Sequence, residues 1–273
     1  MAVIATGKPV VLLIFSGGLI DIQEIKGENI AIVQGWYPGA TGGTAIAQTV
    51  FGEHNRFGKL PFTWYSTNFT NASDFDNLNM TDGPGRTYKY LKDPMVNSLW
   101  PFAYGLSFTT FAISGPALSE PALVVGNPET DAAVTASVTV KNTGAVAGDE
   151  VVFLFKKSHA AAAAYHEAAG KGPPETPVRE LIGFERVTLL PGASKTVSFN
   201  ATVAKLSSVD EFGTRHLLPG SHELVFSRGH GEELRLPLEV TLAPADDARL
   251  VLSHMVGFMG SDAEQLGLHS DEL

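Results

Sequence analysis

The stretch Val134–Val140, with the sequence Val-Thr-Ala-Ser-Val-Thr-Val, decides the fold of the larger part of this 273-residue chain. Apolar and polar side chains alternate along it, which is typical of a strand with one face in a core and the other in water. Val197–Val203 and Leu234–Leu242 repeat the alternation, and Pro237 falls on the polar face, where an edge strand tolerates a missing donor. Pro-Gly turn signals separate such runs. We therefore predict an antiparallel β-sandwich over residues 113–242.

Residues 1–65 follow a different pattern. Val10–Phe15 is an unbroken aliphatic run, the form of a strand buried on both faces of a parallel sheet. Ile30–Val33 is a shorter run of the same kind, and beyond a Gly-rich turn apolar side chains recur at helical spacing from Ala45 until Gly52. This is α/β order with too few strands, because a doubly wound sheet usually has about 5–6. We expect the rest of this α/β domain to lie outside the chain.

A connector joins the two patterns. Residues 66–112 show no sustained period and are rich in Asn, Asp, Thr and aromatic side chains, which predicts an ordered connector packed on a surface. Residues 158–176, with five consecutive alanines and then Gly-Pro-Pro, are predicted to be a low-complexity insertion in the sandwich. Residues 243–273 form an acidic, weakly patterned tail. The predicted fold class is α+β and multidomain, with domains at 1–65 and 113–242.

The composition excludes several classes of partner. A formal net charge of −10 opposes nucleic acid and anionic membrane surfaces, because binding to phosphates needs clustered Lys and Arg. The most apolar run has six residues, whereas a membrane span needs about 20. Zero cysteines exclude disulfides, thiolate metal sites and cysteine nucleophiles. We expect no membrane and no nucleic-acid partner.

Three stretches imitate ligand-binding motifs. Gly52–Leu60 has five residues between its glycines where a phosphate-binding loop has four, and Leu60 replaces the hydroxyl that would hold magnesium. Gly39–Gly43 precedes a predicted helix, but without a dinucleotide fingerprint it indicates a tight turn. Asp74–Asn79 lacks the oxygen ligand and the glycine that a calcium loop needs at its fifth and sixth positions. The eight histidines form no metal-binding pattern. We predict no metal and no cofactor.

Glycosylation sequons point to the secretory pathway. They occur at Asn68, Asn71, Asn79 and Asn200, and the last lies on the wet face of a predicted strand, as glycosylation requires. The terminal tetrapeptide Ser270–Leu273 is similar to an endoplasmic-reticulum retention signal. The parent protein is therefore expected to be secreted or extracellular, with retention in the endoplasmic reticulum as the alternative.

Several stretches carry a resemblance to a known family. They are Trp36–Ala47, Gly58–Tyr65, Gly85–Tyr88, Trp100–Phe108, Val140–Gly144, Gly148–Val152 and Arg179–Val187. In this order they resemble the C-terminal part of the family-three glycoside hydrolases, and the Thr-Trp-Tyr and Gly-Arg-Thr-Tyr details favour the β-xylosidase branch over the β-glucosidases. Two positions depart from the family pattern, since Leu19 and Arg56 stand where the family usually has proline.

The resemblance implies a fold and a division of labour. It implies a partial α/β sandwich followed by a fibronectin-III-like (Ig-like) β-sandwich. The enzymes of this family branch hydrolyse xylo- or arabino-oligosaccharides with an Asp nucleophile on a (β/α)8 barrel and a Glu acid/base. The family segments that carry these two residues are not found in this sequence. No catalytic residue is therefore assigned, and the barrel is the implied partner. The acidic cluster of Asp21, Glu24 and Glu28 is explained by surface solvation.

Trp36 and Tyr37 are the candidate substrate-binding residues. They follow a predicted strand at the end where α/β sheets place ligands, and aromatic faces suit the C–H face of a pyranose. The alternative is that they pack under the missing barrel. We expect this chain to be the C-terminal portion of a β-xylosidase-like hydrolase and to be inactive on its own. The rival interpretation is that it is a stand-alone carbohydrate-binding or adhesion module.

Overall fold

The computed structural model covers most of the predicted elements. Its described residues are 2–74, 76–126, 132–158, 160–163, 176–209 and 215–243. Most of the predicted insertion at 158–176, nearly all of the predicted tail at 243–273 and the tetrapeptide Ser270–Leu273 lie outside them. Among the described residues, none of the helices has the length and apolar character needed to cross a bilayer.

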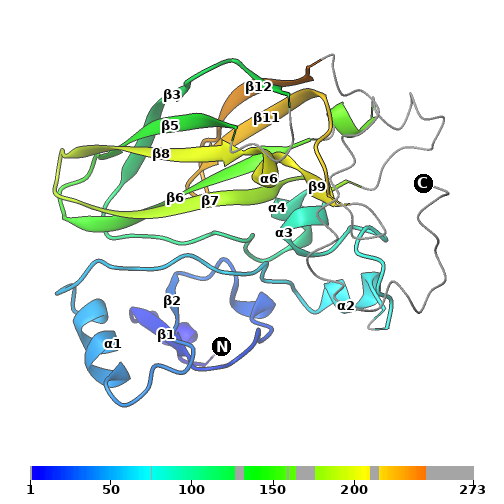
Figure 1. The fold of residues 1–273 in the computed structure, drawn as a ribbon. Coiled ribbons are helices and arrows are strands. Elements are labelled where there is room, and N and C mark those ends of the chain that lie inside the picture. Colours follow the sequence, from blue (N-terminus) through cyan, green and yellow to red (C-terminus); the bar gives the residue numbers. More distant parts are fainter. Residues whose placement is uncertain are drawn as a thin grey trace.

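The N-terminal unit holds a small parallel sheet (Figure 1). Strand β1 (Val10–Ile14) pairs in parallel with β2 (Ile30–Gln34), so that Val10 lies opposite Ile30. The short 3₁₀ turns η1 (Ile4–Thr6) and η2 (Gln23–Ile25) and the helix α1 (Gly42–Val50) complete the unit. The predicted order of strand, strand and helix is confirmed.

The prediction that Val10–Phe15 is buried on both faces is wrong. Ile14 packs in a cluster with Trp64 and Leu99, whereas Val11 and Leu13 point to the other face and are exposed. The cause is that this sheet has two strands among the described residues and one covered face. An isolated two-stranded unit of this kind is marginal in water, so the packing against Trp64 carries much of its stability.

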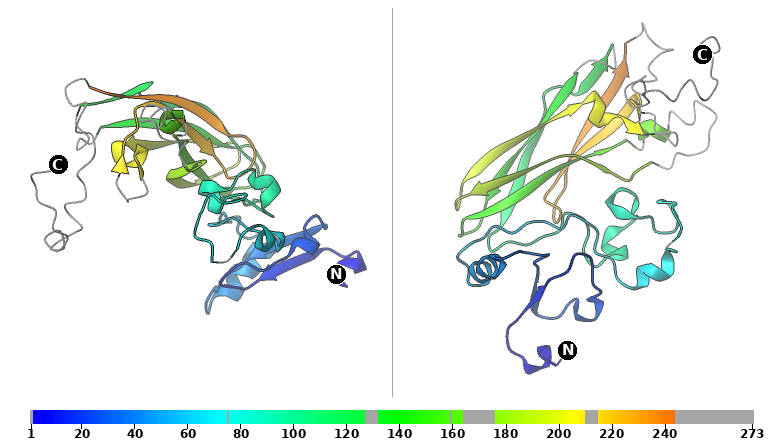
Figure 2. Two further views of the ribbon diagram at one scale, coloured as in Figure 1. Left: turned by 90° about the vertical axis from the view of Figure 1, so that its right-hand side faces the viewer. Right: turned by 60° about the horizontal axis from the view of Figure 1, so that its bottom comes forward.

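The connector lies between the sheet and the sandwich, as the left view of Figure 2 shows. It contains the short helices α2 (Asn68–Ala72), α3 (Thr87–Tyr90) and α4 (Pro94–Asn97). An isolated bridge between Trp64 and Trp100 closes it, and their rings meet edge to face with centroids 5.6 Å apart. The expected ordered connector packs against both of its neighbours.

Two sheets form the C-terminal unit. The larger sheet has the order β4-β12-β11-β6-β7, and the smaller has the order β3-β5-β8. The strands are β3 (Phe111–Leu118), β4 (Ala122–Val125), β5 (Ala133–Asn142), β6 (Gly148–Lys157), β7 (Glu180–Leu189), β8 (Ser194–Thr202), β11 (Gly220–Ser227) and β12 (Leu234–Leu242). The short helix α6 (Val203–Leu206) and the two-residue strands β9 (Ser208–Val209) and β10 (Arg215–His216) complete it. The fold is thus the predicted partial α/β sandwich followed by a β-sandwich.

The sandwich core comes from the predicted alternation. Val134, Val138 and Val140 of β5 face inward and are buried, and Val197 and Ala201 of β8 join them. Phe199 takes part only at the margin of the same cluster. Apolar burial of this extent stabilises by about 25 cal/mol per Å² of surface removed from water, so the C-terminal unit has the stronger core of the two.

The prediction that Pro237 marks an edge strand holds only locally. Strand β12 lies between β4 and β11, and the β12–β4 pairing is parallel, unlike the rest of the sandwich. However, β4 begins opposite Glu239, so β12 has no strand neighbour on that side at Pro237. The missing donor of proline is therefore tolerated inside a sheet because the neighbouring strand is short.

Candidate functional site

The carboxyl ends of β1 and β2 lie side by side and are tied together by hydrogen bonds. The Gly35 amide donates to the Ile14 carbonyl at 2.8 Å. The side-chain Nε2 of Gln34 donates to both the carbonyl and the hydroxyl of Ser16 at 3.2 Å each. Parallel strands place ligands at this end, because loops from neighbouring strands meet there. This edge is therefore the candidate sugar site.

Both predicted substrate-binding residues lie at this edge. Trp36 adopts a left-handed backbone conformation (φ 53°), and its half-buried ring meets Phe62 edge to face at 5.1 Å between centroids. Tyr37 is 77% exposed. A Cβ on Gly17 would lie 2.8 Å from the Tyr37 ring, so the glycine is needed for this close approach. The structure places both residues at this edge, with the Tyr37 ring open to solvent and the Trp36 ring half-buried.

Gln34 is a site residue that the sequence did not reveal. Its side-chain oxygen is buried and has no hydrogen-bond partner among the described residues. A buried acceptor without a partner costs about 1–3 kcal/mol. A hydroxyl group from a ligand would supply the missing donor. Nothing in the sequence marks this residue, because its role depends on the neighbouring strand.

A row of aromatic side chains runs from this edge into the connector. Phe62 contacts Trp64 at 6.0 Å between ring centroids, and Trp100 continues the row to Tyr104 at 6.4 Å. Tyr104 in turn lies 5.7 Å from the ring of His230. These ring contacts connect the candidate site, through the connector, to the sandwich.

The acidic cluster in the crossover between β1 and β2 is solvated, as predicted. Asp21, Glu24 and Glu28 are all exposed. The Thr67 hydroxyl and the Gln23 amide donate to Asp21, and these hydrogen bonds hold its pKa below the ordinary value. An exposed carboxylate with a lowered pKa is a poor general acid at neutral pH.

The glycine-rich turn before α1 also has the predicted structural role. A Cβ on Gly42 would lie 2.5 Å from the Pro38 ring, so this glycine permits close packing. Among the described residues, no group of three or more His, Cys, Asp or Glu is arranged to hold a metal ion.

Comparisons with known proteins follow this architecture. The model of the glycosyl hydrolase family 3 C-terminal domain matches residues 1–108, and that of the fibronectin type III-like domain matches residues 161–228. A xylan 1,4-β-xylosidase of Xylanibacter ruminicola is 34% identical over 240 residues, covering 87% of this chain and 25% of the relative. The chain belongs to glycosyl hydrolase family 3.

Two further relatives refine the assignment. A periplasmic β-glucosidase of Salmonella typhimurium is 35% identical over 207 residues, covering 74% of this family 3 chain and 25% of the relative. The solved structure of a family 3 exo-β-xylosidase in complex with a xylobiose aziridine probe superimposes with a TM-score of 0.70 and 26% identity. That match covers 88% of this chain and 32% of the other. The chain thus corresponds to the C-terminal part of a β-xylosidase-like glycosidase and spans about a quarter of the curated relatives.

The family motifs of this family 3 chain join its two units. Asn55, in the rejected phosphate-loop stretch, donates to the Ala147 carbonyl at 3.1 Å and accepts from Ser107 and Phe108 at 2.9 and 3.0 Å. A Cβ on Gly148 would collide with the Asn55 amide. Arg186 donates to the backbone carbonyls of Arg56 and Phe57. The departure at Arg56 is therefore compatible with the junction, because its backbone makes the contact.

Charged residues complete the junction. Lys59 pairs with Glu150 at 2.7 Å, and Arg228 pairs with the other oxygen of Glu150 at 3.1 Å. The side chains of Lys59 and Glu150 are only 8% and 2% exposed. Burial lowers the pKa of Lys59, and attraction to Glu150 opposes that shift. Because these residues are far apart in sequence, sequence reasoning missed the cluster.

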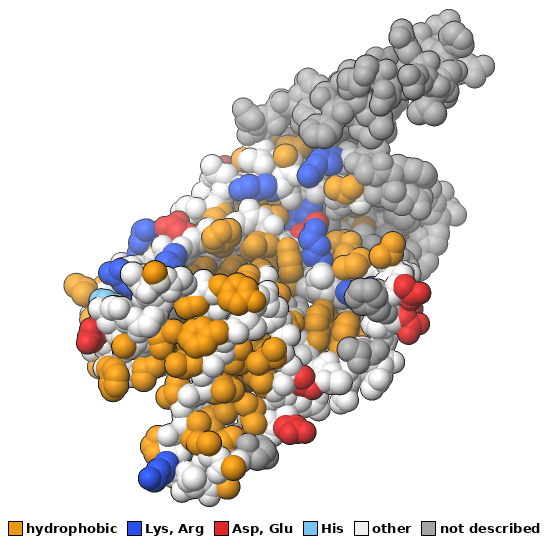
Figure 3. Space-filling view, turned by 90° about the horizontal axis from the view of Figure 1, so that it is seen from below, with side chains coloured by type: hydrophobic (Ala, Val, Ile, Leu, Met, Phe, Trp, Pro, Cys, Tyr) orange, Lys and Arg blue, Asp and Glu red, His pale blue; other side chains and the backbone are white. Residues whose placement is uncertain are grey.

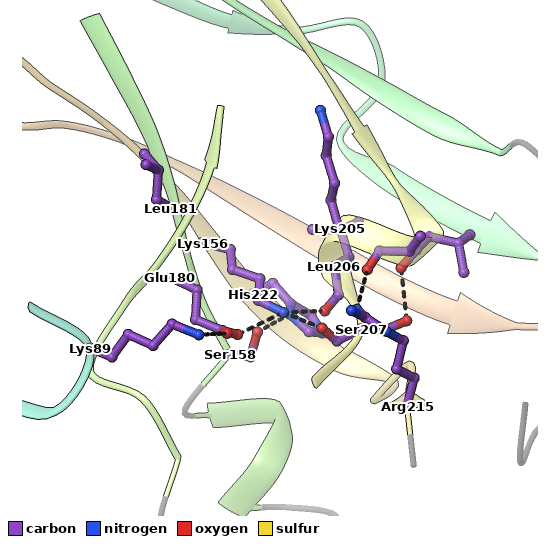
Figure 4. A network of polar contacts seen from close by, with 12 residues as sticks. Lys89, Lys156, Ser158, Glu180, Leu181, Lys205, Leu206, Ser207, Arg215 and His222 are labelled. Carbon is purple, nitrogen blue, oxygen red and sulfur yellow. Dashed lines mark hydrogen bonds and ion pairs between the residues drawn. The ribbon is translucent and has the colours of Figure 1, made fainter. Parts of the chain in front are cut away.

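A second charged network, drawn in Figure 4, fixes the connector to the sandwich. Lys156 pairs with Glu180 at 2.9 Å and also donates to two backbone carbonyls. Glu180 pairs in addition with Lys89 of α3 at 3.1 Å. Burial raises the pKa of Glu180, but the two ammonium groups outweigh it and hold that pKa below the ordinary value. Nearby, the buried His222 donates from Nε2 to the Leu218 carbonyl at 2.7 Å and accepts from the Ser158 hydroxyl at 3.0 Å. These contacts are structural, since both imidazole nitrogens are occupied within the protein.

The four sequon asparagines are all exposed. Asn68 and Asn71 lie on α2, Asn79 lies in the connector, and Asn200 lies on the outer face of β8. The Asn200 side chain accepts from the Thr135 hydroxyl at 3.0 Å. Their positions leave them accessible to a modifying enzyme, and their glycosylation stays a prediction. The domain boundaries at 65 and 112 stay predictions too.

Proposed function

We propose that this chain is the sugar-site-bearing C-terminal portion of a hydrolase that cleaves xylo- or arabino-oligosaccharides, with the fibronectin-like sandwich as a brace. The observation that carries the proposal is the aromatic pair Trp36 and Tyr37 at the carboxyl ends of β1 and β2. The similarity to a xylan β-xylosidase supports the substrate class.

The proposed sugar contact combines stacking with a hydrogen bond. The exposed Tyr37 ring and the half-buried Trp36 ring offer apolar faces to the C–H face of a pyranose. The unpartnered oxygen of Gln34 is the proposed acceptor for a sugar hydroxyl. The edge-on contact with Phe62 fixes the Trp36 ring before ligand binding, which lowers the entropic cost of recognition.

A retaining glycosidase hydrolyses its substrate with two carboxyl groups about 5–5.5 Å apart. Asp21, Glu24 and Glu28 are exposed and solvated, so we assign neither role to them. The proposal therefore places both carboxyl groups in a part of the enzyme beyond these residues, and the chain alone is expected to be inactive.

The proposed binding surface for the part that carries the catalytic carboxyl groups is the apolar face of the N-terminal unit. Val11 and Leu13 of β1 and the adjoining Phe15 are exposed there, and Figure 3 shows hydrophobic side chains gathered at the end of the molecule that holds β1, β2 and α1. Monomeric proteins rarely expose contiguous patches of this kind. The length of the curated relatives, which exceeds the matched segment about fourfold, supports the (β/α)8 barrel as the occupant.

The test uses purified chain, an aryl β-xyloside and xylotriose. We expect no turnover of the xyloside, and saturable xylotriose binding that Tyr37→Ala weakens. Phe184→Ala removes an aromatic ring of similar exposure from β7 and should leave binding unchanged. Turnover by material free of contaminating glycosidase would refute the proposed division of labour.

The rival proposal of a stand-alone carbohydrate-binding or adhesion module makes a different prediction in solution. A chain that needs a partner over its apolar face should self-associate, because among the described residues β1 and β2 each also have an unpaired edge. Sedimentation velocity separates the two, since a monodisperse monomer that binds xylotriose would favour the stand-alone module.

We also propose that the parent protein enters the secretory pathway and is glycosylated. A periplasmic relative and four exposed sequons support an extracytoplasmic location. Expression in a secreting eukaryotic host should give glycan-sensitive mass shifts. Deletion of residues 270–273 tests retention, because the secreted amount rises only if that tetrapeptide holds the chain in the endoplasmic reticulum.

A further inference from the structure

A pocket of about 220 Å³ lies at the junction of the two units, away from the candidate sugar site. Lys59 reaches it from the N-terminal unit, and Glu150, Arg228 and His230 reach it from the sandwich. Ser107 completes the lining from the segment that joins the units. The pocket is therefore assembled only when both units are in place.

The charges in this pocket do not balance. Lys59 and Arg228 share the single carboxylate of Glu150, one on each oxygen. The first of those oxygens also accepts from the Val151 amide at 2.9 Å. With both cations protonated, the group of Lys59, Arg228 and Glu150 carries a net charge of +1, and the Glu150 carboxylate already accepts from three donors.

The pocket also has more donors than acceptors. Arg228 Nε, which is a donor, and His230 Nδ1, which donates only when it carries a proton, are buried and have no hydrogen-bond partner among the described residues. The nearby hydroxyl groups of Ser107 and Thr109 donate to Asn55 at 2.9 Å and to Asn142 at 2.8 Å, and neither accepts from Arg228 Nε or His230 Nδ1. Buried donors without partners cost free energy that an acceptor-rich ligand would remove.

We propose that this pocket binds a small oxyanion, of the size of a phosphate or a short carboxylate. Such an ion supplies the missing negative charge and several acceptor oxygens, and the planar guanidinium of Arg228 suits a paired contact with two of them. The volume of about 220 Å³ is below the ~300 Å³ at which pockets for drug-sized ligands begin. A neutral sugar would leave the excess charge in place.

Binding has a consequence for the junction. The anion contacts Lys59 of one unit and Arg228 of the other, so it binds the docked arrangement and not the separated one. By linkage, it stabilises the docked state by an amount that grows with the logarithm of its concentration above the Kd. Burial and the charges of Lys59 and Arg228 lower the pKa of His230, and a bound anion would raise that pKa again.

The test is thermal unfolding with inorganic phosphate or acetate, against sodium chloride at equal ionic strength. We expect stabilisation that grows with the logarithm of the concentration of at least one oxyanion, and the comparison of phosphate with acetate shows which of the two is preferred. Arg228→Lys keeps a cation beside Glu150 but removes Nε and the planar fork, so binding should weaken at least about tenfold. Arg235→Lys, at a 56% exposed position on β12, should bind like the wild type.

His230→Phe provides a second variant if Arg228→Lys does not fold, as judged by circular dichroism. It keeps an aromatic ring beside Tyr104 but removes the buried nitrogen, and the response to the oxyanion should again weaken. The proposal is overturned if neither oxyanion stabilises the wild type more than chloride does. It is equally overturned if Arg235→Lys weakens the response as much as the pocket variants do.

Discussion

Replacing Glu150 by Gln tests the charged junction between the two units most sharply. The side chain is 2% exposed, and it receives Lys59 at 2.7 Å and Arg228 at 3.1 Å. Glutamine keeps the shape but removes the charge, so two buried cations lose their counterion. Breaking a buried ion pair in this way costs about 3–5 kcal/mol. Because the amide oxygen of Gln still accepts one hydrogen bond, we expect the lower end, about 3 kcal/mol.

The penalty should also depend on pH in a defined direction. Burial already lowers the pKa of Lys59, and Glu150 opposes that shift, so loss of Glu150 lowers the pKa further. The unfolded chain keeps this lysine protonated up to its ordinary pKa of 10.5. Between the two values the unfolded state binds more protons, so the stability of the variant rises with pH. The wild type gains less in the same direction, because its Lys59 pKa lies nearer the ordinary value, so the penalty becomes smaller as the pH rises toward 10.5.

Guanidinium chloride unfolding of wild type, Glu150→Gln and Glu185→Gln measures these values. Glu185 pairs with Lys195 at 2.8 Å on the surface, where both side chains are more than a third exposed. That control should lose about 0–1 kcal/mol. If Glu150→Gln loses no more than Glu185→Gln, the junction is not held by the buried charges and the reasoning is wrong.

Three further predictions concern single positions. Burial lowers the pKa of His222, so the folded state keeps the imidazole neutral where the unfolded chain, with its ordinary pKa of 6.5, binds a proton. The free energy of unfolding therefore falls as the pH drops below 6.5. Melting curves of His222→Gln should show a weaker pH dependence than those of the wild type. Gly148→Ala should destabilise by about 1–3 kcal/mol through collision with Asn55, whereas Gly43→Ala, with open space around it in α1, should be neutral or more stable by up to about 1 kcal/mol in the same assay. Asn200→Gln should remove one glycan-sensitive mass step from protein secreted by a eukaryotic host, while circular dichroism stays unchanged; an unaltered step would contradict glycosylation at β8.

The strands of the sandwich were predictable because alternation is a local property. Val134–Val140 carries its inward and outward faces in its own sequence, and β5 has the expected pattern of burial. The helix after the Gly-rich turn was predictable for the same reason. The second face of β1 was not, because an apolar run shows that a strand can be covered, but the cover itself depends on other segments.

The polar contacts between the units were beyond prediction from one sequence. Lys59, Glu150 and Arg228 come from three separate segments, and each alone has the character of an ordinary surface charge. The rejection of Gly52–Leu60 as a phosphate loop left Asn55 without a role, and the structure shows this residue bound to the sandwich. Gln34 acquires its unpartnered oxygen only through its position beside Ser16.

The most direct test of the sugar site uses the three tryptophans of the chain as reporters. Labelled with 5-fluorotryptophan, the protein gives fluorine NMR signals for Trp36 at the candidate site and for Trp64, which is only 2% exposed. On titration with xylotriose, the Trp36 signal should shift saturably while the Trp64 signal stays in place, and maltotriose should have little effect. No shift at Trp36 with xylotriose, or an equal shift with maltotriose, would contradict a xyloside site on this chain.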